Sequence, residues 1–228
     1  MINLKKGNNL FKKALEFKSK RTIENEQVGL LREMVSYTGK HSPFYKSMYR
    51  KNRIKHLDIK TIHDLTVLPL TSREQLQKYN NSFYCVDKKE IADIVSTTGT
   101  TGEPVFIVLT KNDLKRLTLN EVYSFSCAGA TANDIFHLAV TMDNLFMAGI
   151  AYYLGIVELG AGVYRAGMHN IKRQILLMQK LKPTGIMTVP SFLLQLGKEI
   201  RRRGLIHHHY QLKKPCWLEI VSEIRIFI

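Results

Sequence analysis

The sequence has no apolar run long enough to cross a bilayer. Its longest nearly apolar stretch, residues 145–157, is shorter than the roughly 20 residues that a transmembrane helix needs, and Glu158 follows it directly. The N-terminus carries repeated lysines in place of the apolar stretch of a signal peptide. We therefore expect a cytoplasmic protein that makes no membrane association.

Cysteine is also scarce. Cys85, Cys127 and Cys216 are odd in number, far apart and without a Cys-x-x-Cys pair, so neither a disulfide framework nor a zinc ribbon is indicated. Three consecutive histidines, residues 207–209, are the one alternative for a transition metal. Because adjacent side chains point in different directions on a helix or a strand, we predict no metal site.

Acidic residues are few beside basic ones, 19 against 34, which gives a net charge of +15. Such a charge raises the hypothesis of nucleic-acid binding. The basic residues are spread over several segments, however, and no aromatic-interleaved motif accompanies them. This distribution is typical of a solvated surface that attracts polyanions in general, so we predict no specific nucleic-acid partner.

Hydroxyl side chains and glycines, by contrast, gather in one segment. Residues 96–102 read Ser-Thr-Thr-Gly-Thr-Thr-Gly, between the apolar run 91–95 and the β-rich run 105–109. Glycine allows positive φ and a close backbone approach, while Ser and Thr add hydroxyl donors to the backbone N–H groups. The segment is therefore predicted to be a loop between two strands that can hold phosphate oxygens. A plain polar hairpin turn is the alternative.

Two common phosphate motifs do not fit this segment. Gly99 and Gly102 are three residues apart with no Lys-Ser or Lys-Thr after the second, which excludes a Walker A loop. No third glycine opens a helix, so the dinucleotide fingerprint fails as well.

The rest of the chain predicts an α/β fold. A helix is expected over residues 24–37 from its apolar spacing, and Thr71 with Glu74 predicts a capping box that starts another helix. After the loop, helices are predicted over residues 110–128, 146–159, 171–181 and 191–203, alternating with strands over 135–142, 162–165 and 185–189. This alternation predicts crossover units and a mostly parallel sheet. His137 is expected to be a satisfied core histidine.

The hydroxyl-rich segment resembles the phosphate loop of the AMP-forming adenylating enzymes. Further segments place the chain near the phenylacetate–coenzyme A ligase branch of that superfamily. They are His-Ser-Pro-Phe-Tyr at 41–45, Leu-Pro-Leu-Thr-Ser-Arg-Glu-Gln-Leu at 68–76, Asp-Asn-Leu-Phe-Met-Ala-Gly at 143–149, Leu-Gly-Ala-Gly-Val at 159–163 and the segment 182–191. Each is weak alone, but their order is specific, and together they cover roughly residues 27 to 200.

The resemblance implies the N-terminal part of an adenylating-enzyme large domain. It further implies a ligase that converts a carboxylate into an acyl adenylate and then a coenzyme A thioester, with ATP, Mg and coenzyme A as cosubstrates and cofactor. The ATP phosphates would be held by Ser96, Thr97, Thr98, Gly99, Thr100, Thr101 and Gly102. The carboxylate would contact Phe146, Ala148, Gly149 and Ser191. The alternative is that these residues only pack at helix N-termini, with Asp143 and Asn144 as caps. No catalytic residue is assigned.

The chain departs from the family in two ways. Glu103 stands where a lysine is frequent, so no role is given to its side chain. A ligase of this branch is also about twice as long, and the Tyr-Gly-x-Thr-Glu segment and the catalytic lysine of the C-terminal domain are not found in the sequence.

We accordingly expect three parts: an N-terminal helical segment 1–90, a partial adenylation domain 91–204, and a tail 205–228 that lies outside the family pattern through truncation or frameshift. We also expect self-association, or a separate C-terminal chain that complements this one. The alternative function is a noncatalytic nucleotide- or polyanion-binding fragment that acts with a partner chain.

Overall fold

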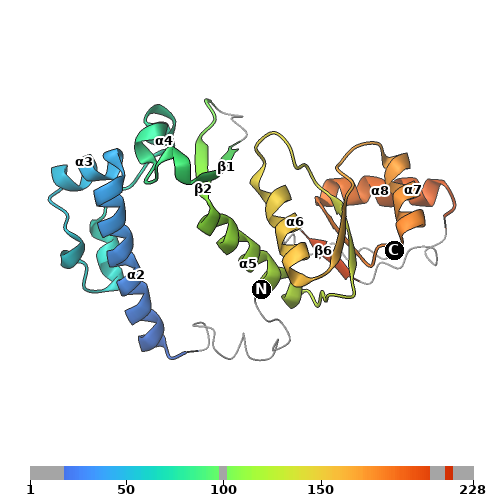
Figure 1. The fold of residues 1–228 in the computed structure, drawn as a ribbon, viewed down its shortest axis with the longest axis horizontal. Coiled ribbons are helices and arrows are strands. Elements are labelled where there is room, and N and C mark those ends of the chain that lie inside the picture. The colour runs from blue at the N-terminus through green and yellow to red at the C-terminus, as the bar shows by residue number, and fades with distance from the viewer. Residues whose placement is uncertain (1–17, 98–101, 206–213, 218–228) are drawn as a thin grey trace. The chain divides into compact units, whose positions relative to one another are not determined.

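The computed structural model describes residues 18–97, 102–205 and 214–217 (Figure 1). The chain divides into two compact units. Unit 1 comprises Met1–Ile91 and Thr97–Val108, and unit 2 comprises Ala92–Ser96 and Leu109–Ile228. Among the described residues, no helix has both the length and the apolarity to cross a membrane.

Unit 1 is mainly helical. Its α-helices are α2 (Lys20–His41), α3 (Pro43–Lys51) and α4 (Arg73–Lys78), and its 3-10 helices are η3 (His56–Asp58), η4 (Ile62–Val67), η5 (Asn80–Phe83) and η6 (Lys88–Glu90). The predicted helix over 24–37 is confirmed within α2, which buries Val28, Leu31 and Val35. A small core then forms from Leu31, Val35, Tyr49 and Ile59.

The predicted capping box of α4 was wrong by one residue. Ser72, rather than Thr71, is the N-cap: its hydroxyl accepts from the Gln75 N–H at 3.3 Å, and the Ser72 N–H donates to Gln75 Oε1 at 2.9 Å. The Thr71 hydroxyl lies 3.4 Å from that of Tyr45 instead. Two overlapping Ser/Thr-x-x-Glu/Gln patterns compete here, and the tertiary contact to Tyr45 occupies the first.

Strands β1 (Ile91–Ser96) and β2 (Phe106–Thr110) form a two-stranded sheet. They flank the hydroxyl-rich segment, as the sequence predicted.

Unit 2 is an alternating α/β structure. It contains α5 (Lys111–Cys127), β3 (Ile135–Ala139), α6 (Met147–Leu159), β4 (Gly162–Arg165), α7 (Ile171–Leu181), β5 (Gly185–Thr188), α8 (Pro190–Arg202) and β6 (Lys214–Trp217). The strands pair in parallel in the order β4-β3-β5-β6, with His137 opposite both Tyr164 and Ile186. The predicted fold class is confirmed.

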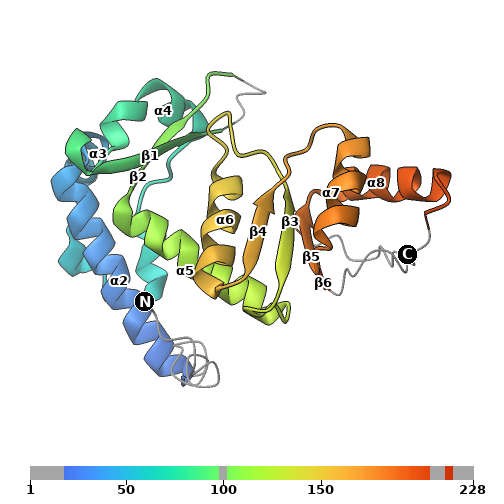
Figure 2. The same ribbon diagram turned by 45° about the vertical axis from the view of Figure 1, so that its right-hand side comes forward.

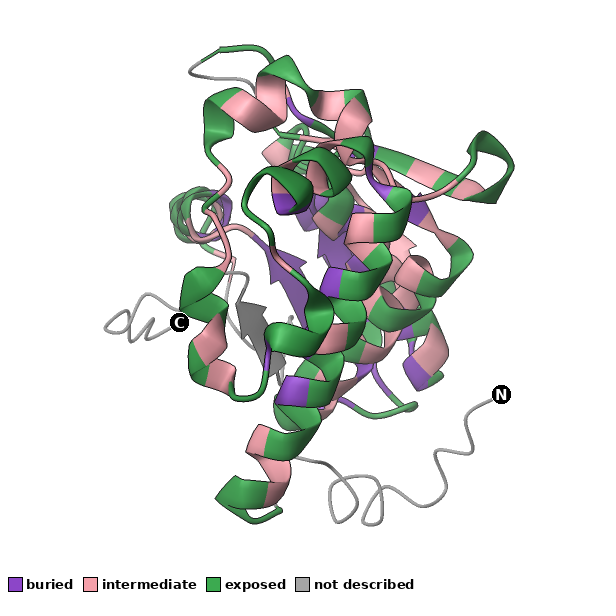
Figure 3. Cartoon of the chain, turned by 90° about the vertical axis from the view of Figure 1, so that its left-hand side faces the viewer, coloured by how far each residue is buried: buried purple, intermediate pink, exposed green. Residues whose placement is uncertain are grey.

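Helices cover both faces of this sheet. Figure 2 shows α6 on one side of β4 and β3, and α7 with α8 on the other. Phe125 of α5 packs edge-on against Phe136 of β3, with ring centroids 5.3 Å apart. On the opposite face, α7, β5 and α8 contribute a cluster of Ile175, Met178, Ile186, Leu193 and Leu196. The sheet is therefore the centre of the core, and Figure 3 shows buried positions concentrated on its strands.

His137 lies in the middle of β3 and is fully buried. Its Nδ1 is 2.8 Å from the Tyr164 hydroxyl, while its Nε2 has no hydrogen-bond partner among the described residues. Burial lowers the pKa of the imidazole from 6.5 to about 4, against a smaller raising effect of the Gln174 side chain. The prediction of a core histidine is confirmed, although only one of its ring nitrogens has a hydrogen-bond partner.

This buried imidazole makes stability depend on pH. Because the pKa is lower in the folded than in the unfolded state, the unfolded chain binds more protons between pH 6.5 and 4. Stability is therefore lost as the pH falls through this window, by up to about 3 kcal/mol. Urea unfolding of the wild type and of His137→Gln measures this loss. From pH 7 to pH 4, the unfolding free energy of the wild type should fall by about 3 kcal/mol more than that of the variant. A difference that stays constant would contradict the assignment.

Candidate functional site

The topology of unit 2 defines one edge of the sheet as the place for a ligand. The chain leaves β3 toward β4 on one side, whereas β5 lies on the other side of β3 and leads on to β6. The strand order therefore reverses between β3 and β5. In open parallel sheets, ligands bind outside the carboxyl ends of the strands at such a switch point. The segments that leave β3 and β5 there are residues 140–146 and 189–191.

The segment after β3 takes a sharp turn with unusual backbone angles. Asn144 and Leu145 both have positive φ, 54° and 58°. The Leu145 carbonyl accepts a hydrogen bond from the Ser96 N–H at 3.1 Å, and the Phe146 N–H donates to the Asp143 carbonyl at 3.2 Å. Ser96, the first residue of the hydroxyl-rich segment, is thereby joined to the turn that precedes Phe146.

Two helix N-termini follow the switch point, and both lack side-chain caps. The N-cap residues are Phe146 for α6 and Val189 for α8, neither makes a side-chain capping bond, and neither helix has an acidic residue in its first turn. Asp143 and Asn144, which the sequence offered as alternative caps of α6, therefore do not cap it. The described α2, α3, α4, α5 and α7 have caps from Ser19, Ser42, Ser72, Thr110 and Asn170. Uncapped N–H groups and the helix dipole favour an anion at this edge.

Gly149 shows why α6 can begin so close to β3. A Cβ at Gly149 would meet the Thr141 carbonyl oxygen at 2.1 Å, so only glycine allows this approach. Because Gly149 has no side chain, the first turn of α6 can pack directly on the backbone of the segment after β3.

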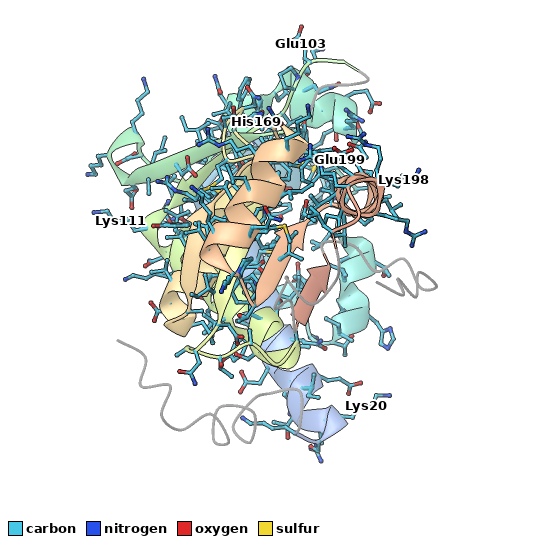
Figure 4. All side chains as sticks on the ribbon, turned by 90° about the vertical axis from the view of Figure 1, so that its right-hand side faces the viewer. Lys20, Glu103, Lys111, His169, Lys198 and Glu199 are labelled. Carbon is cyan, nitrogen blue, oxygen red and sulfur yellow. The ribbon has the colours of Figure 1, made fainter. Side chains whose placement is uncertain are left out.

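From Thr97 onward, the described residues of the hydroxyl-rich loop are anchored within unit 1. Thr97 Oγ1 accepts from the Val105 N–H at 3.0 Å, and the Thr97 N–H donates to the Val105 carbonyl at 3.0 Å. Gln77 Nε2 donates to the Glu103 carbonyl at 2.6 Å, next to Gly102 with a φ of 148°. Both ends of the loop are therefore fixed to the surrounding backbone. The Glu103 side chain itself is exposed (Figure 4).

The predicted site residues fall into three groups. Ser96, Phe146, Ala148, Gly149 and Ser191 all lie in unit 2, at the ends of β1, β3 and β5 or in the first turn of the following helix. Thr97 and Gly102 lie in unit 1. Thr98, Gly99, Thr100 and Thr101 lie outside the described residues, as do the histidines 207–209. Within the described part of the chain, no cluster of three or more His, Cys, Asp or Glu residues is placed to hold a metal.

Sequence reasoning missed the Leu145 carbonyl. A backbone acceptor carries no sequence signal, and only the Asp-Asn pair before Leu145 hinted at a turn.

Known proteins with a similar sequence are coenzyme A ligases. No family model matches the chain. Phenylacetate-coenzyme A ligase of Thermus thermophilus is 29% identical over 81% of the chain, and that of Aromatoleum evansii is 27% identical over 87%. The chain is therefore similar in sequence to phenylacetate-coenzyme A ligases. It spans about two fifths of the length of the curated relatives it matches, 41% and 45% for these two.

Solved structures support the fold independently. A 2-hydroxyisobutyryl-CoA ligase in complex with 2-HIB-AMP and CoA superimposes with a TM-score of 0.79 and 20% identity, over 86% of this chain and 43% of that one. An open conformation of this ligase gives a TM-score of 0.78 at 19% identity, over 85% of this chain and 46% of that one. At such identity the likeness establishes the fold alone.

The tight contact at Gly149 can be tested by stability. Gly149→Ala should lower the free energy of unfolding by about 2–3 kcal/mol, because a Cβ would overlap a backbone oxygen that cannot easily move. Gly197→Ala in α8 is the matched control: a Cβ there meets nothing within 4 Å, so this variant should be neutral or more stable by about 0.5–1 kcal/mol. Denaturant unfolding measures both. Equal effects of the two substitutions would show that α6 does not pack as described.

Proposed function

We propose that this chain provides the ATP phosphate-binding part of an AMP-forming carboxylate–coenzyme A ligase. One observation carries the proposal. The first residue of the hydroxyl-rich loop, Ser96, is hydrogen-bonded to the turn after β3, at the switch point of a parallel sheet. The ligase relatives and their shared fold support the same function.

Adenylation of a carboxylate requires hydrogen-bond donors at fixed positions around the phosphate oxygens of ATP. In such a ligase, a carboxylate oxygen forms a bond to the α-phosphorus of ATP while the bond to the departing pyrophosphate breaks. The thiol of coenzyme A then attacks the acyl carbon, and AMP leaves. Negative charge on the leaving pyrophosphate is stabilised by donors that are already in place. We assign this role to Ser96, Thr97, Thr98, Gly99, Thr100, Thr101 and Gly102, with the β- and γ-phosphates as their ligand.

The residues present fit a phosphate ligand. Gly102 combines a positive φ with exposure, so its backbone can approach an anion without a side chain in the way. Within unit 2 itself, the N-termini of α6 and α8 have N–H groups without a side-chain cap, which also favour an anion. Mg, which commonly accompanies ATP, would supply positive charge to the phosphates.

For the carboxylate, we propose Phe146, Ala148, Gly149 and Ser191. Phe146 is 38% exposed, enough to offer a ring face to a flat acyl group. Ser191 is an exposed hydroxyl in the first turn of α8. The relatives' names make phenylacetate the first acid to test.

A second candidate is a noncatalytic nucleotide-binding chain that works with a partner. It is favoured by the short span of the match, less than half of each ligase relative. The phosphate site would be the same, but the groups for adenine, ribose and acyl transfer would come from the partner.

The phosphate loop makes a direct binding prediction. Replacing Gly99 and Gly102 together by valine should abolish ATP binding in isothermal titration calorimetry, because branched side chains block the backbone approach. Gly29→Val on α2 is the control, since a Cβ there meets nothing within 4 Å. The salt-dependent attraction of the basic chain to duplex DNA should be unchanged in both variants.

Equal loss of ATP and DNA binding in the loop variant would indicate one shared polyanion surface and contradict a separate phosphate site. Tight, sequence-selective DNA binding by the wild type would favour a nucleic-acid function.

Catalysis gives a further prediction. The chain alone should show no carboxylate-dependent exchange of pyrophosphate into ATP above background, since it spans less than half of each ligase relative. A chimera of residues 1–204 followed by the remaining part of the Thermus thermophilus ligase should show exchange with phenylacetate. The same chimera with Gly102→Val is the control and should be inactive. Exchange by the chain alone would show that fewer parts are needed than we propose.

A further inference from the structure

The loop after β4, residues 166–170, is a tight turn at the same carboxyl edge of the sheet. The N–H groups of Ala166 and Gly167 both donate to the Leu138 carbonyl, at 2.8 and 3.2 Å. Gly167 has a φ of 66°, and His169 lies exposed beyond it. The loop is therefore attached to the end of β3, beside the segment that leads to the switch point; His169 is labelled in Figure 4.

One buried side chain holds the carbonyl groups of this loop. Gln174 of α7 has no exposed surface. Its Nε2 lies within hydrogen-bond distance of three carbonyl oxygens, those of Ala166 at 3.2 Å, Gly167 at 3.0 Å and His169 at 3.4 Å. The amide nitrogen of Gln174 carries two hydrogens and donates, whereas Oε1 can only accept. The carbonyl oxygens of the loop are therefore paired only when the nitrogen, and not Oε1, faces them.

Tyr164 of β4 makes a hydrogen bond to His137, which lies near the Gln174 side chain. Burial raises the pKa of its phenol, so the hydroxyl keeps its proton and can donate. The hydroxyl lies 2.8 Å from His137 Nδ1, and the two rings meet edge to face with centroids 5.0 Å apart. If the phenol donates, Nδ1 is an acceptor and the imidazole proton is on Nε2.

Two buried polar atoms then remain to be paired. Within the part of the chain that the structure describes, His137 Nε2 and Gln174 Oε1 are the buried side-chain atoms without a hydrogen-bond partner. One is a donor in this tautomer and the other an acceptor. The Gln174 side chain also acts directly on the His137 imidazole, whose pKa it raises against burial. A buried polar atom that stays unpaired has lost its hydrogen bonds to water without replacement, so mutual pairing is favoured.

We propose that Tyr164, His137 and Gln174 form a directional hydrogen-bond relay that positions the 166–169 loop as a wall of the ligand site. Tyr164 fixes the tautomer of His137, the Nε2–H of His137 holds Gln174 Oε1, and the amide nitrogen of Gln174 then faces the loop carbonyls. A flipped amide would place Oε1 against three carbonyl oxygens. Gln174 is thus a positioning residue, and this role in ligand binding rests on the proposed function.

Hydrogen exchange tests the anchoring. In Gln174→Met, the amides of Ala166 and Gly167 should exchange at least tenfold faster than in the wild type, while core amides of α7 keep their rates. Gln179→Met on the same helix is the matched control and should leave the loop unchanged. Unchanged loop exchange in Gln174→Met would overturn the proposal.

The relay itself is tested at His137, which also covers the case that Gln174→Met fails to fold. His137→Gln can still present an amide N–H toward Gln174 and should preserve loop protection, whereas His137→Leu should lose it. Long-range ¹H–¹⁵N NMR of the wild type should show the proton on Nε2. A proton on Nδ1, or equal loop protection in both variants, would overturn the relay.

Binding of a non-hydrolysable phenylacetyl-adenylate sulfamate tests the positioning role. Gln174→Met should weaken its binding at least tenfold, and Gln179→Met should not. Wild-type affinity in Gln174→Met would overturn the positioning role. No binding by the wild type would overturn the ligand role of the loop. The ATP titration decides the proposed phosphate-binding function separately, and the exchange and NMR results decide the relay.

Discussion

The parallel pairing of β3 with a strand on each side is the constraint on which the rest of unit 2 depends. It makes β3 a central strand, buried from Phe136 to Ala139. Because β4 and β5 lie on opposite sides of it, their crossover helices cover opposite faces, as right-handed connections require. The same reversal of strand order leaves the segments after β3 and β5 next to each other. The position of the candidate site follows from the strand order.

The hydrogen bond from the Ser96 N–H to the Leu145 carbonyl links this edge to the hydroxyl-rich loop. It depends on two consecutive residues with positive φ, Asn144 and Leu145, of which only Asn adopts this conformation readily. Such backbone strain costs about 1–3 kcal/mol per residue and tends to occur at functional sites. The packing of Gly149 on the Thr141 carbonyl, a few residues away, fixes the helix that follows. The turn is therefore held from both of its ends.

Polar groups at this edge differ in kind from those in the rest of the chain. Ser and Thr side chains cap helices in unit 1 and α5, which satisfies the first N–H groups locally. The helices that follow β3 and β5 have Phe146 and Val189 at the same position, and their N–H groups have no side-chain cap. In unit 2, these uncapped helix ends favour an anion at the carboxyl edge of the sheet.

The sequence by itself determined the order of helices and strands in unit 2 through α8, since apolar periodicity and local capping act within a few residues. It predicted each strand and helix of unit 2 through α8, and the two strands around the loop, to within a few residues. Sequence patterns failed where a contact distant in the chain decides between two local possibilities. Ser72 caps α4, while the Thr71 hydroxyl contacts that of Tyr45. Asp143 and Asn144 lie in a turn and do not cap α6. Only the tertiary structure decided the strand order, and with it which loops share an edge. Strand pairing joins residues far apart in the chain, and neither register nor neighbour is encoded in the local pattern of one segment.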